Sequence, residues 1–313
     1  MNERPQAPLP SRPRPFAAVI VPVFNEHEQV GQTLQSILDV RGEEPWEIIV
    51  VNDGSTDRTA EVLKPFEGSV RVLTHPSNYG YGAALKSGIH ATRAENVIFM
   101  DSDGQHDPAH IPAFIERLKT HEFVIGLRRN EQGVPFVRRP GKMVLKLVVS
   151  FLVGQRVSDV NYGFRGGRRR LYLRMLDLLP DGFSFSTTSL VYVLKSRFSV
   201  AYMEVPTAQR KGISTVRIVR DGMNTLLLAL RLIMLFDPMR AFAYPSLGLI
   251  AIGVLYQIYI ILFYRFSIVG GSLLSILSGV ILFHFGLLAD QIASLRKEMS
   301  AQSGLLEENI DER

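Results

Sequence analysis

Two long segments without charged residues near the carboxyl end place the strongest constraint on this chain. Residues 241–264 contain no Asp, Glu, Lys or Arg, residues 266–289 contain none either, and Arg265 separates the two. Each segment is longer than the roughly 20 apolar residues that a helix needs to cross a membrane. The pattern predicts a two-helix transmembrane hairpin over 241–290. A pair of buried core helices is the alternative, although core helices rarely run this long without charge.

Basic residues flank the predicted spans on the side of the preceding domain. They are Arg231, Arg240, Arg296 and Lys297. Two spans place both chain ends on one side of the membrane, and the positive-inside bias makes that side cytoplasmic. We expect an integral membrane protein with cytoplasmic termini and a cytoplasmic tail at 291–313. A bacterial or archaeal inner membrane is favoured over the endoplasmic reticulum.

The remaining composition narrows the partners. Five prolines in the first 15 residues, without an apolar run, predict a disordered arm at 1–15 and no secretory signal. The chain has no cysteine, which excludes disulfides and thiolate metal sites. Its net charge is +5, but the basic residues gather at 128–174 and 210–240, close to the spans. Anionic lipid headgroups or phosphorylated lipids are therefore expected partners, and nucleic acid is not.

Strand-like apolar runs alternate with helix-like stretches in the first half of the chain. The expected strands are 17–23, 47–51, 70–73, 97–100 and 123–125, and the expected helices are 28–38, 58–63, 82–92 and 109–119. The alternation predicts an α/β domain over 16–212, with a Rossmann-like, mostly parallel sheet and helices on both faces. Asp107 followed by Pro108 is typical of a helix start.

Two further apolar helices are expected after this alternation, at 143–153 and 225–236. Arg217, Arg220 and Arg231 lie on or beside the second. Amphipathic helices of this kind lie on membrane surfaces, so we expect juxtamembrane interfacial helices, the second within 213–240. For the first helix a place in the core is the alternative.

Two carboxylates two positions apart follow the fourth expected strand. In extended backbone Asp101 and Asp103 point the same way. With the amide of Gln105 they suit Mg²⁺ or Mn²⁺, which would neutralise a diphosphate leaving group. A helix cap within a solvated turn is the alternative, and Asp107 fits the cap. A calcium loop is also compatible with Asp-x-Asp-Gly, but the distal Glu of such loops is absent.

Polar residues also follow the first two expected strands. Asp53 can accept the ring N–H of uracil or guanine, so UDP- and GDP-sugars both fit. Phe24, Asn25 and Glu26 add an aromatic face and a carboxylate. The carboxyl ends of parallel strands form one ligand-binding edge, so the three loops predict a nucleotide site.

Together these motifs resemble the family 2 glycosyltransferases of GT-A fold. The shared motifs are Pro-Val-aromatic-Asn-Glu at 22–26, Asn-Asp-Gly-Ser-x-Asp at 52–57, a glycine-bearing turn at 78–84 and Asp-x-Asp at 101–103. The most similar subgroup is the polyisoprenyl-phosphate glycosyltransferases, which includes dolichol-phosphate mannose synthases and bacterial undecaprenyl-phosphate sugar transferases. The resemblance covers residues 16 to about 236, and the paired spans extend it.

The resemblance implies a set of site residues. It assigns the metal to Asp101, Asp103 and Gln105, places Arg128 near the donor and acceptor phosphates, and places Asp159 and Arg165 at the reaction centre. Guanidinium groups bind phosphate in a bidentate manner, so Arg128, Arg139 and Arg165 are the expected acceptor-phosphate ligands. The expected catalytic residues are Asp103, Asp159 and Arg128. The expected donor-binding residues are Pro22, Phe24, Asn25, Glu26, Asp53, Gly80, Asp101, Ser102, Asp103, Gln105 and Arg210.

One motif departs from the family pattern. The family shows Arg-x-x-Gly-x-Ser-Lys before its membrane part, whereas this chain has Gln209 and Thr215 at the Arg and Lys positions. Arg210, Lys211 or Arg217 is the expected substitute.

The expected reaction is an inverting, metal-dependent transfer of a sugar from a nucleotide-diphospho-sugar to a polyisoprenyl phosphate, undecaprenyl or dolichyl. A processive polysaccharide synthase is one alternative, but two spans form no polymer channel and Gln-x-x-Arg-Trp is absent. An inert membrane scaffold or flippase accessory is another, and the intact Asp101, Asp103 and Gln105 speak against it. Small residues in the second span favour helix contacts, which keeps a homo-oligomer open; they are Ser272, Ser275, Ser278 and Gly279.

Overall fold

A seven-stranded sheet forms the centre of the soluble domain in the computed structural model, which describes residues 14–41, 45–128, 139–157, 159–160, 162–206, 218–264 and 269–311. The strand order is β3-β2-β1-β4-β6-β5-β7. The strands are β1 (Ala17–Val23), β2 (Glu47–Asn52), β3 (Arg71–Thr74), β4 (Asn96–Phe99), β5 (Phe123–Arg128), β6 (Arg165–Arg168) and β7 (Val200–Val205). Only β6, among these strands, runs antiparallel to its neighbours. The mostly parallel sheet expected from the sequence is confirmed.

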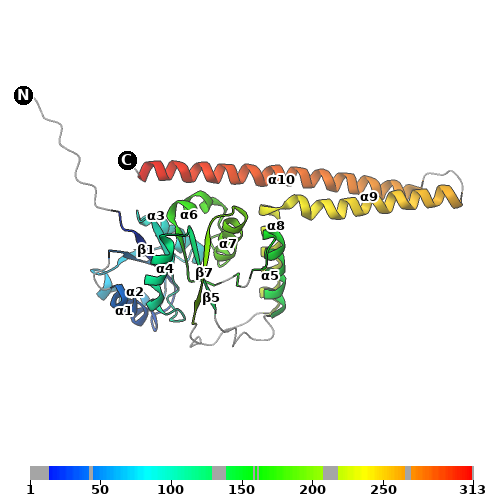
Figure 1. Ribbon diagram of the computed structural model, residues 1–313. Helices are drawn as coiled ribbons and strands as arrows, with labels where there is room; N and C mark the ends of the chain where they lie inside the picture. The colour runs from blue at the N-terminus through cyan, green and yellow to red at the C-terminus, as the bar shows by residue number, and fades with distance from the viewer. Residues whose placement is uncertain are drawn as a thin grey trace, which may run out of the picture.

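Helices cover both faces of the sheet (Figure 1). The helices of the soluble domain are α1 (Val30–Arg41), α2 (Thr59–Leu63), α3 (Tyr81–Ala91), α4 (Ile111–Leu118), α5 (Arg139–Val153), α6 (Arg169–Met175), α7 (Phe185–Lys195) and α8 (Ile218–Phe236), with short 3₁₀ helices η1 (Lys64–Phe66), η2 (Pro108–His110) and η4 (Leu176–Leu178). The expected helix at 109–119 is divided between η2 and α4. Asp107 caps η2, since its side chain accepts from the Ala109 N–H at 2.9 Å.

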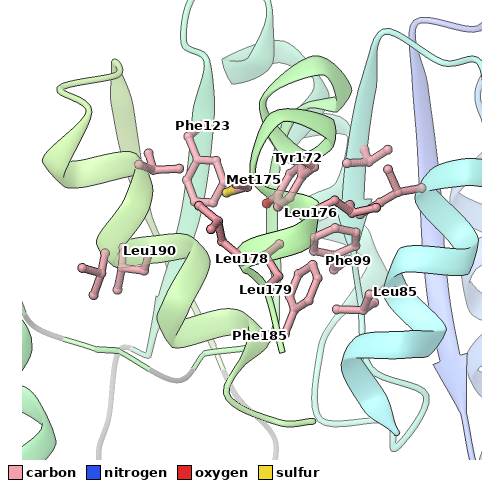
Figure 2. Packing of buried hydrophobic residues seen from close by; sticks show 14 of the residues in the cluster. Leu85, Phe99, Phe123, Tyr172, Met175, Leu176, Leu178, Leu179, Phe185 and Leu190 are labelled. Atoms are coloured by element: carbon pink, nitrogen blue, oxygen red, sulfur yellow. The ribbon is translucent and has the colours of Figure 1, made fainter. Parts of the chain in front are cut away.

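The sheet separates two apolar clusters, as its uninterrupted apolar strands require. Every residue of β1 is buried, which is typical of a parallel strand covered on both faces. On one face Phe99 meets the rings of Tyr172 and Phe185 edge-on, at centroid distances of 4.9 and 5.6 Å. Figure 2 shows this cluster, to which α3, α6 and α7 contribute. Trp46 and Phe114 belong to the cluster on the other face.

The two charge-free segments form a long helical hairpin, α9 (Pro238–Phe263) and α10 (Gly270–Asp311). Both helices are long and apolar enough to cross a membrane, and only 11% and 17% of their most apolar windows are buried within the chain. Such exposure fits lipid-facing helices and argues against core helices. Gly253 and Gly279 let the helices approach, since a Cβ at either would lie within 3.0 Å of the partner helix.

Helices α5 and α8 lie side by side at the base of the hairpin and run across its direction (Figure 1). Each presents large exposed apolar residues, which include Met143, Leu147 and Phe151 on α5 and Leu226 and Leu230 on α8. An apolar face left uncovered beside a membrane hairpin is the arrangement expected of interfacial helices.

The end of the chain differs from the expected tail. Residues 291–311 continue α10 and pack on α6 (Figure 1). The Ser300 hydroxyl donates to the Arg174 carbonyl at 2.9 Å, and Glu308 lies 3.5 Å from the Arg174 guanidinium. A Cβ at Gly304 would lie 2.6 Å from the Arg174 backbone, so glycine permits the contact. The sequence has no proline after Pro245, so none interrupts α10, and this helix continues beyond its apolar half.

Candidate functional site

The three polar loops predicted from the sequence meet at one edge of the sheet. Val23 of β1 pairs with Asn52 of β2, and Ile20 of β1 pairs with Phe99 of β4, all in parallel register. Residues 24–26, 53–57 and 101–105 therefore leave the sheet at the carboxyl ends of adjacent strands. Ligands bind at this edge in open α/β sheets.

Hydrogen bonds join the loop after β1 to the loop after β2. The Asn25 N–H donates to Ser55 Oγ at 3.0 Å, the Thr56 N–H donates to Asn25 Oδ1 at 2.8 Å, and the Glu26 N–H donates to Thr59 Oγ1 at 3.1 Å. Asn25 has a φ of 53°, a conformation that asparagine tolerates better than most residues. The joined loops leave Phe24 exposed and available to a ligand. Pro22, by contrast, is buried within β1 opposite Val51.

Asp53 is a buried structural acceptor. Its carboxylate accepts from the Tyr79 and Gly80 N–H groups at 2.9 and 2.8 Å and lies 2.7 Å from His75 Nδ1. The side chain is only 4% exposed. The sequence predicted that Asp53 reads the nucleobase; in the structure this carboxylate is buried and is contacted by three protein groups. Asp53 instead holds the turn at Gly80, whose φ of 107° favours glycine.

Asp101 and Asp103 are half-buried at the end of β4. Asp101 Oδ1 accepts from the Tyr81 hydroxyl at 2.9 Å, and the Asp101 N–H donates to His106 Nδ1 at 3.3 Å. Asp103 accepts from the backbone and side-chain N–H groups of Gln105, at 3.1 and 2.7 Å. Of the residues predicted to hold a metal, Asp103 and Gln105 are in direct contact, and Asp101 lies two positions before Asp103 at the end of the same strand.

Ser102, between the two acids, is buried. Its carbonyl accepts from the Thr33 hydroxyl of α1 at 3.1 Å, which anchors the loop to the helix after β1. Ser102 was expected to contact the sugar donor, but protein covers most of this residue.

Gly163 lies directly against Asp101. A Cβ at this position would lie 3.0 Å from Asp101 Cγ and closer still to Oδ2. Since β6 pairs with β4, this glycine enters the site beside the Asp-x-Asp loop. The close approach explains why the motif that leads into β6 requires glycine here.

Arg165 is fully buried, which argues against its predicted role as an acceptor-phosphate ligand. Its guanidinium donates to the carbonyls of Tyr162 and Ser186. Burial lowers its pKa, and nearby groups that include Asp159 and Asp101 oppose this effect. Arg165 thus places a positive charge beneath the site and donates to backbone carbonyls. Asp159 lies close enough to raise the pKa of Arg165.

For two of the other predicted arginines, the structure gives the position of the backbone only. Arg128 ends β5 opposite Val205, at the same edge of the sheet as Asp101, because β5 runs parallel to β4 through β6. Arg139 begins α5. The side chains of these two arginines, and the whole of Arg210, lie outside the described residues.

Tyr81 and the loop after η4 belong to the site, although neither was predicted to take part. Burial, and then the charge of Asp101, raises the pKa of Tyr81, so its hydroxyl stays protonated and donates to Asp101. Phe183 stacks on Tyr81 at 5.4 Å and is itself exposed. Asp181 fixes this loop, because its carbonyl accepts from the Ala83 N–H and its carboxylate lies 2.7 Å from Lys86. The sequence signal for the participation of Tyr81 was an aromatic residue directly after the glycine turn.

The oxygen atoms at this edge fit a hard divalent cation. Asp101 and Asp103 offer carboxylates and Gln105 an amide, the ligands that Mg²⁺ and Mn²⁺ prefer. Gly163 packs against the Asp101 carboxylate without adding a side chain of its own. No group of three or more His, Cys, Asp or Glu side chains suited to a metal occurs within the described ranges. Substrate oxygens and water would complete the coordination shell.

Comparison with known families divides the chain where its architecture changes. Residues 18–178 match the family described as Glycosyl transferase family 2, and residues 237–295 match the GtrB C-terminal hairpin. The first match covers strands β1 to β6 and the three polar loops at the sheet edge, and the second covers α9 and the apolar half of α10.

Individual relatives extend these matches. The chain is 26% identical over 241 residues to a dodecaprenyl-phosphate galacturonate synthase of Rhizobium johnstonii, covering 74% of this chain and 71% of that protein. It is 30% identical to an uncharacterized protein of Methanocaldococcus jannaschii, covering 66% and 86%. An undecaprenyl-phosphate 4-deoxy-4-formamido-L-arabinose transferase of Edwardsiella ictaluri is 27% identical, covering 61% of this chain and 59% of that protein.

A solved structure confirms the fold. Glucosyl-3-phosphoglycerate synthase from Mycobacterium tuberculosis, in complex with Mn²⁺, UDP and phosphoglyceric acid, superimposes with a TM-score of 0.56 at 20% identity. The superposition covers 69% of this chain and 78% of that structure. The same enzyme has been solved with Mg²⁺ and UDP.

Proposed function

Because this chain belongs to glycosyl transferase family 2, we propose that it transfers a sugar from a nucleotide-diphospho-sugar to a polyisoprenyl phosphate at the cytoplasmic face of a membrane. The observation that carries the proposal is the placement of the Asp101 and Asp103 carboxylates in a domain from which the apolar pair α5 and α8 and the α9–α10 hairpin extend.

The names of the relatives support the acceptor. The Rhizobium johnstonii and Edwardsiella ictaluri proteins are a dodecaprenyl-phosphate synthase and an undecaprenyl-phosphate transferase. Their alignments with this chain cover 71% and 59% of their lengths. A polyprenyl phosphate also fits the architecture, because an acceptor with a long apolar chain enters from the bilayer.

A uridine nucleotide is the first donor to test. The neighbouring structures of glucosyl-3-phosphoglycerate synthase hold UDP with Mn²⁺ or Mg²⁺. With Asp53 enclosed by protein donors, the exposed Phe24 ring is the best placed described group to stack on a base. A GDP-sugar is the alternative donor.

The proposed step is a single in-line displacement. An oxygen of the lipid phosphate attacks the anomeric carbon, the bond from that carbon to the diphosphate oxygen breaks, and the nucleoside diphosphate leaves with the bonding electron pair. The configuration at the anomeric carbon inverts. A phosphate monoester is largely dianionic at neutral pH, since its second pKa is about 6, so the attacking oxygen needs no strong base.

The residues of the chain then act mainly by positioning and charge neutralisation. Asp101, Asp103 and Gln105 would hold Mg²⁺ or Mn²⁺, which supplies positive charge to the leaving diphosphate. Arg128 and Arg139 remain the proposed phosphate ligands. The buried Arg165 and the nearby Asp159 are proposed positioning residues.

Purified full-length protein in detergent provides the test. It is incubated with a short polyprenyl phosphate, radiolabelled UDP- or GDP-sugars, and Mn²⁺ or EDTA. We expect labelled lipid from one donor, loss of product with EDTA, and inversion at the anomeric carbon by NMR. If the protein shows no transfer and no donor hydrolysis with any donor, the result favours an inert scaffold. A product ladder longer than one sugar would favour a processive synthase.

A further inference from the structure

A cavity of about 470 Å³ lies where α8, the loop after η4 and α10 meet. Its lining is mostly apolar, with Leu178, Leu179, Met234 and Ile292, and also includes Arg231 and Arg296. None of the residues proposed to bind donor, metal or acceptor phosphate lines it. The volume lies within the range of small-ligand sites.

The predicted span of α10 ends at the cavity, which would place the cavity at the membrane surface. Ala289, the last residue of the charge-free part of α10, lines it together with Arg296 seven positions later. Seven residues of helix rise about 10 Å, which with the reach of an arginine side chain corresponds to the headgroup layer. Exposed leucines precede the cavity-lining residues on both helices, Leu227 and Leu230 on α8 and Leu288 on α10.

The charges around the cavity favour an anion. Asp237, the acid at the α8–α9 junction, is engaged by Lys195 at 3.4 Å and Arg240 at 3.3 Å. Within the described ranges, no ion pair joins Arg231 or Arg296 to an acidic residue. Asp177 also lines the cavity, but it lies beyond ion-pair distance of both arginines. Two free guanidinium groups suit a phosphate.

The cavity is separated from the catalytic edge by one loop. Leu179 and Pro180 line the cavity, and the next residues face the catalytic side, where Asp181 contacts Lys86 and Phe183 stacks on Tyr81. A phosphate bound by Arg231 and Arg296 is thus on the opposite side of the loop from Asp101.

We propose that this cavity binds the phosphate headgroup of an anionic membrane phospholipid, with Arg231 and Arg296 as its ligands. The apolar wall accepts the glycerol and the first acyl carbons, and the chains follow the exposed faces of α8 and α10. The site is additional to the proposed acceptor site and does not depend on the identity of the sugar.

The test uses the full chain in nanodiscs of phosphatidylcholine, alone or mixed with phosphatidylglycerol. Retained lipid is measured by native mass spectrometry, and stability by the midpoint of thermal unfolding. We expect one phosphatidylglycerol to be retained and the midpoint to rise with it. The double variant Arg231→Gln/Arg296→Gln should bind phosphatidylglycerol about 100-fold more weakly, which corresponds to the loss of two charged hydrogen bonds.

Arg240→Gln is the matched control, because Arg240 is also an exposed arginine at the base of the hairpin and does not line the cavity. It should retain lipid as the wild type does. An equal loss in both variants would show diffuse attraction to the surface and overturn the proposal. A double variant with the wild-type unfolding midpoint in pure phosphatidylcholine confirms that it is folded.

Two further measurements distinguish a phospholipid from free phosphate and from polyprenyl phosphate as the ligand of this cavity. Inorganic phosphate that raises the midpoint in phosphatidylcholine as much as phosphatidylglycerol does would make this a free-anion site and overturn the lipid assignment. A double variant with a raised KM for polyprenyl phosphate and unchanged phosphatidylglycerol retention would make it an acceptor site. Sugar transfer in detergent without phospholipid should persist in the double variant, so failure of this proposal and of the proposed function are distinguishable.

Discussion

The loops after β2 and β4 both carry aspartates at the same edge of the sheet, yet their surroundings differ. Asp53, after β2, is buried and accepts from two backbone N–H groups, with His75 as a third partner. Asp101 and Asp103, after β4, are half-buried and are contacted by a tyrosine hydroxyl and by a neighbouring glutamine. A carboxylate enclosed by protein donors stabilises a turn, whereas one with open oxygens can bind a ligand.

We expect the largest loss of activity at Asp103, and the nearby acid Asp107 is the control. Asp103→Asn should lower kcat/KM for sugar transfer by roughly 10³-fold, because a neutral amide no longer helps to hold a cation worth several kcal/mol to the leaving group. Asp107→Asn, the same change in the same loop, keeps an oxygen for the cap of η2 and should be nearly silent. Equal activity in the two variants would remove Asp103 from the site.

Gly163→Ala should reduce activity by about 10²-fold, the usual consequence of a misplacement near 1 Å. The added methyl group would displace the Asp101 carboxylate, which lies within 3.0 Å of its position. Gly68→Ala, where nothing lies within 4 Å, is the control. Steady-state kinetics for both variants, with the unfolding midpoint beside them, would show whether the loss is local.

Asp53→Asn should act on stability. Replacing an acceptor-only carboxylate by an amide disturbs the bonds from Tyr79 and Gly80, at a cost of roughly 2 kcal/mol in the free energy of unfolding. Asp39→Asn, at an exposed residue that accepts from Gln35, should cost much less. A large loss of activity without a shift in the unfolding midpoint would contradict the structural role and restore Asp53 to the nucleobase site.

Tyr81→Phe should raise the Mn²⁺ concentration for half-maximal activity about tenfold, because a hydrogen bond that orients a metal-ligating carboxylate is lost. Manganese titrations of the transfer rate would measure the shift. Tyr202→Phe, at an exposed tyrosine on β7, is the matched control. A fall in kcat at unchanged manganese dependence would instead place Tyr81 in direct contact with substrate.

The smallest expected effect concerns Asp57, in the loop after β2. Burial raises its pKa, but hydrogen bonds from Thr59 and His27 outweigh this and lower the pKa to about 2. Because the folded-state pKa lies below the ordinary value of 3.8, the stabilisation is complete above about pH 4 and is lost as the pH falls toward 2. Asp57→Asn should remove on the order of 1 kcal/mol of that acid dependence, measured by thermal unfolding between pH 5 and 3.

Much of this edge could be predicted from the sequence, because the signals there are local. β1 has the predicted bounds, and the other four predicted strands are present within a few residues. The Asp-x-Asp loop follows β4 as expected. Apolar runs that end in polar turns are enough to place such loops on a parallel sheet.

The remaining features depend on contacts between distant residues. Nothing local marks β6, a four-residue strand with two glycines, because its position depends on pairing with β4 and β5. The burial of Asp53 and Arg165 could not be foreseen for the same reason. A charged residue in a motif can bind a ligand or satisfy buried backbone groups, and only the tertiary structure distinguishes the two.

Because α10 is one continuous helix, it sets the distance between the sheet edge that carries Asp101 and the predicted membrane. Its 42 residues amount to about 63 Å of helix, of which roughly 30 Å crosses a bilayer core. The other half is bound to α6 through Ser300, Gly304 and Glu308, so the sheet edge is held at one set elevation above the membrane. For the proposed reaction, the length of the acceptor chain in the bilayer is then unconstrained, while α10 sets the depth of the reacting phosphate.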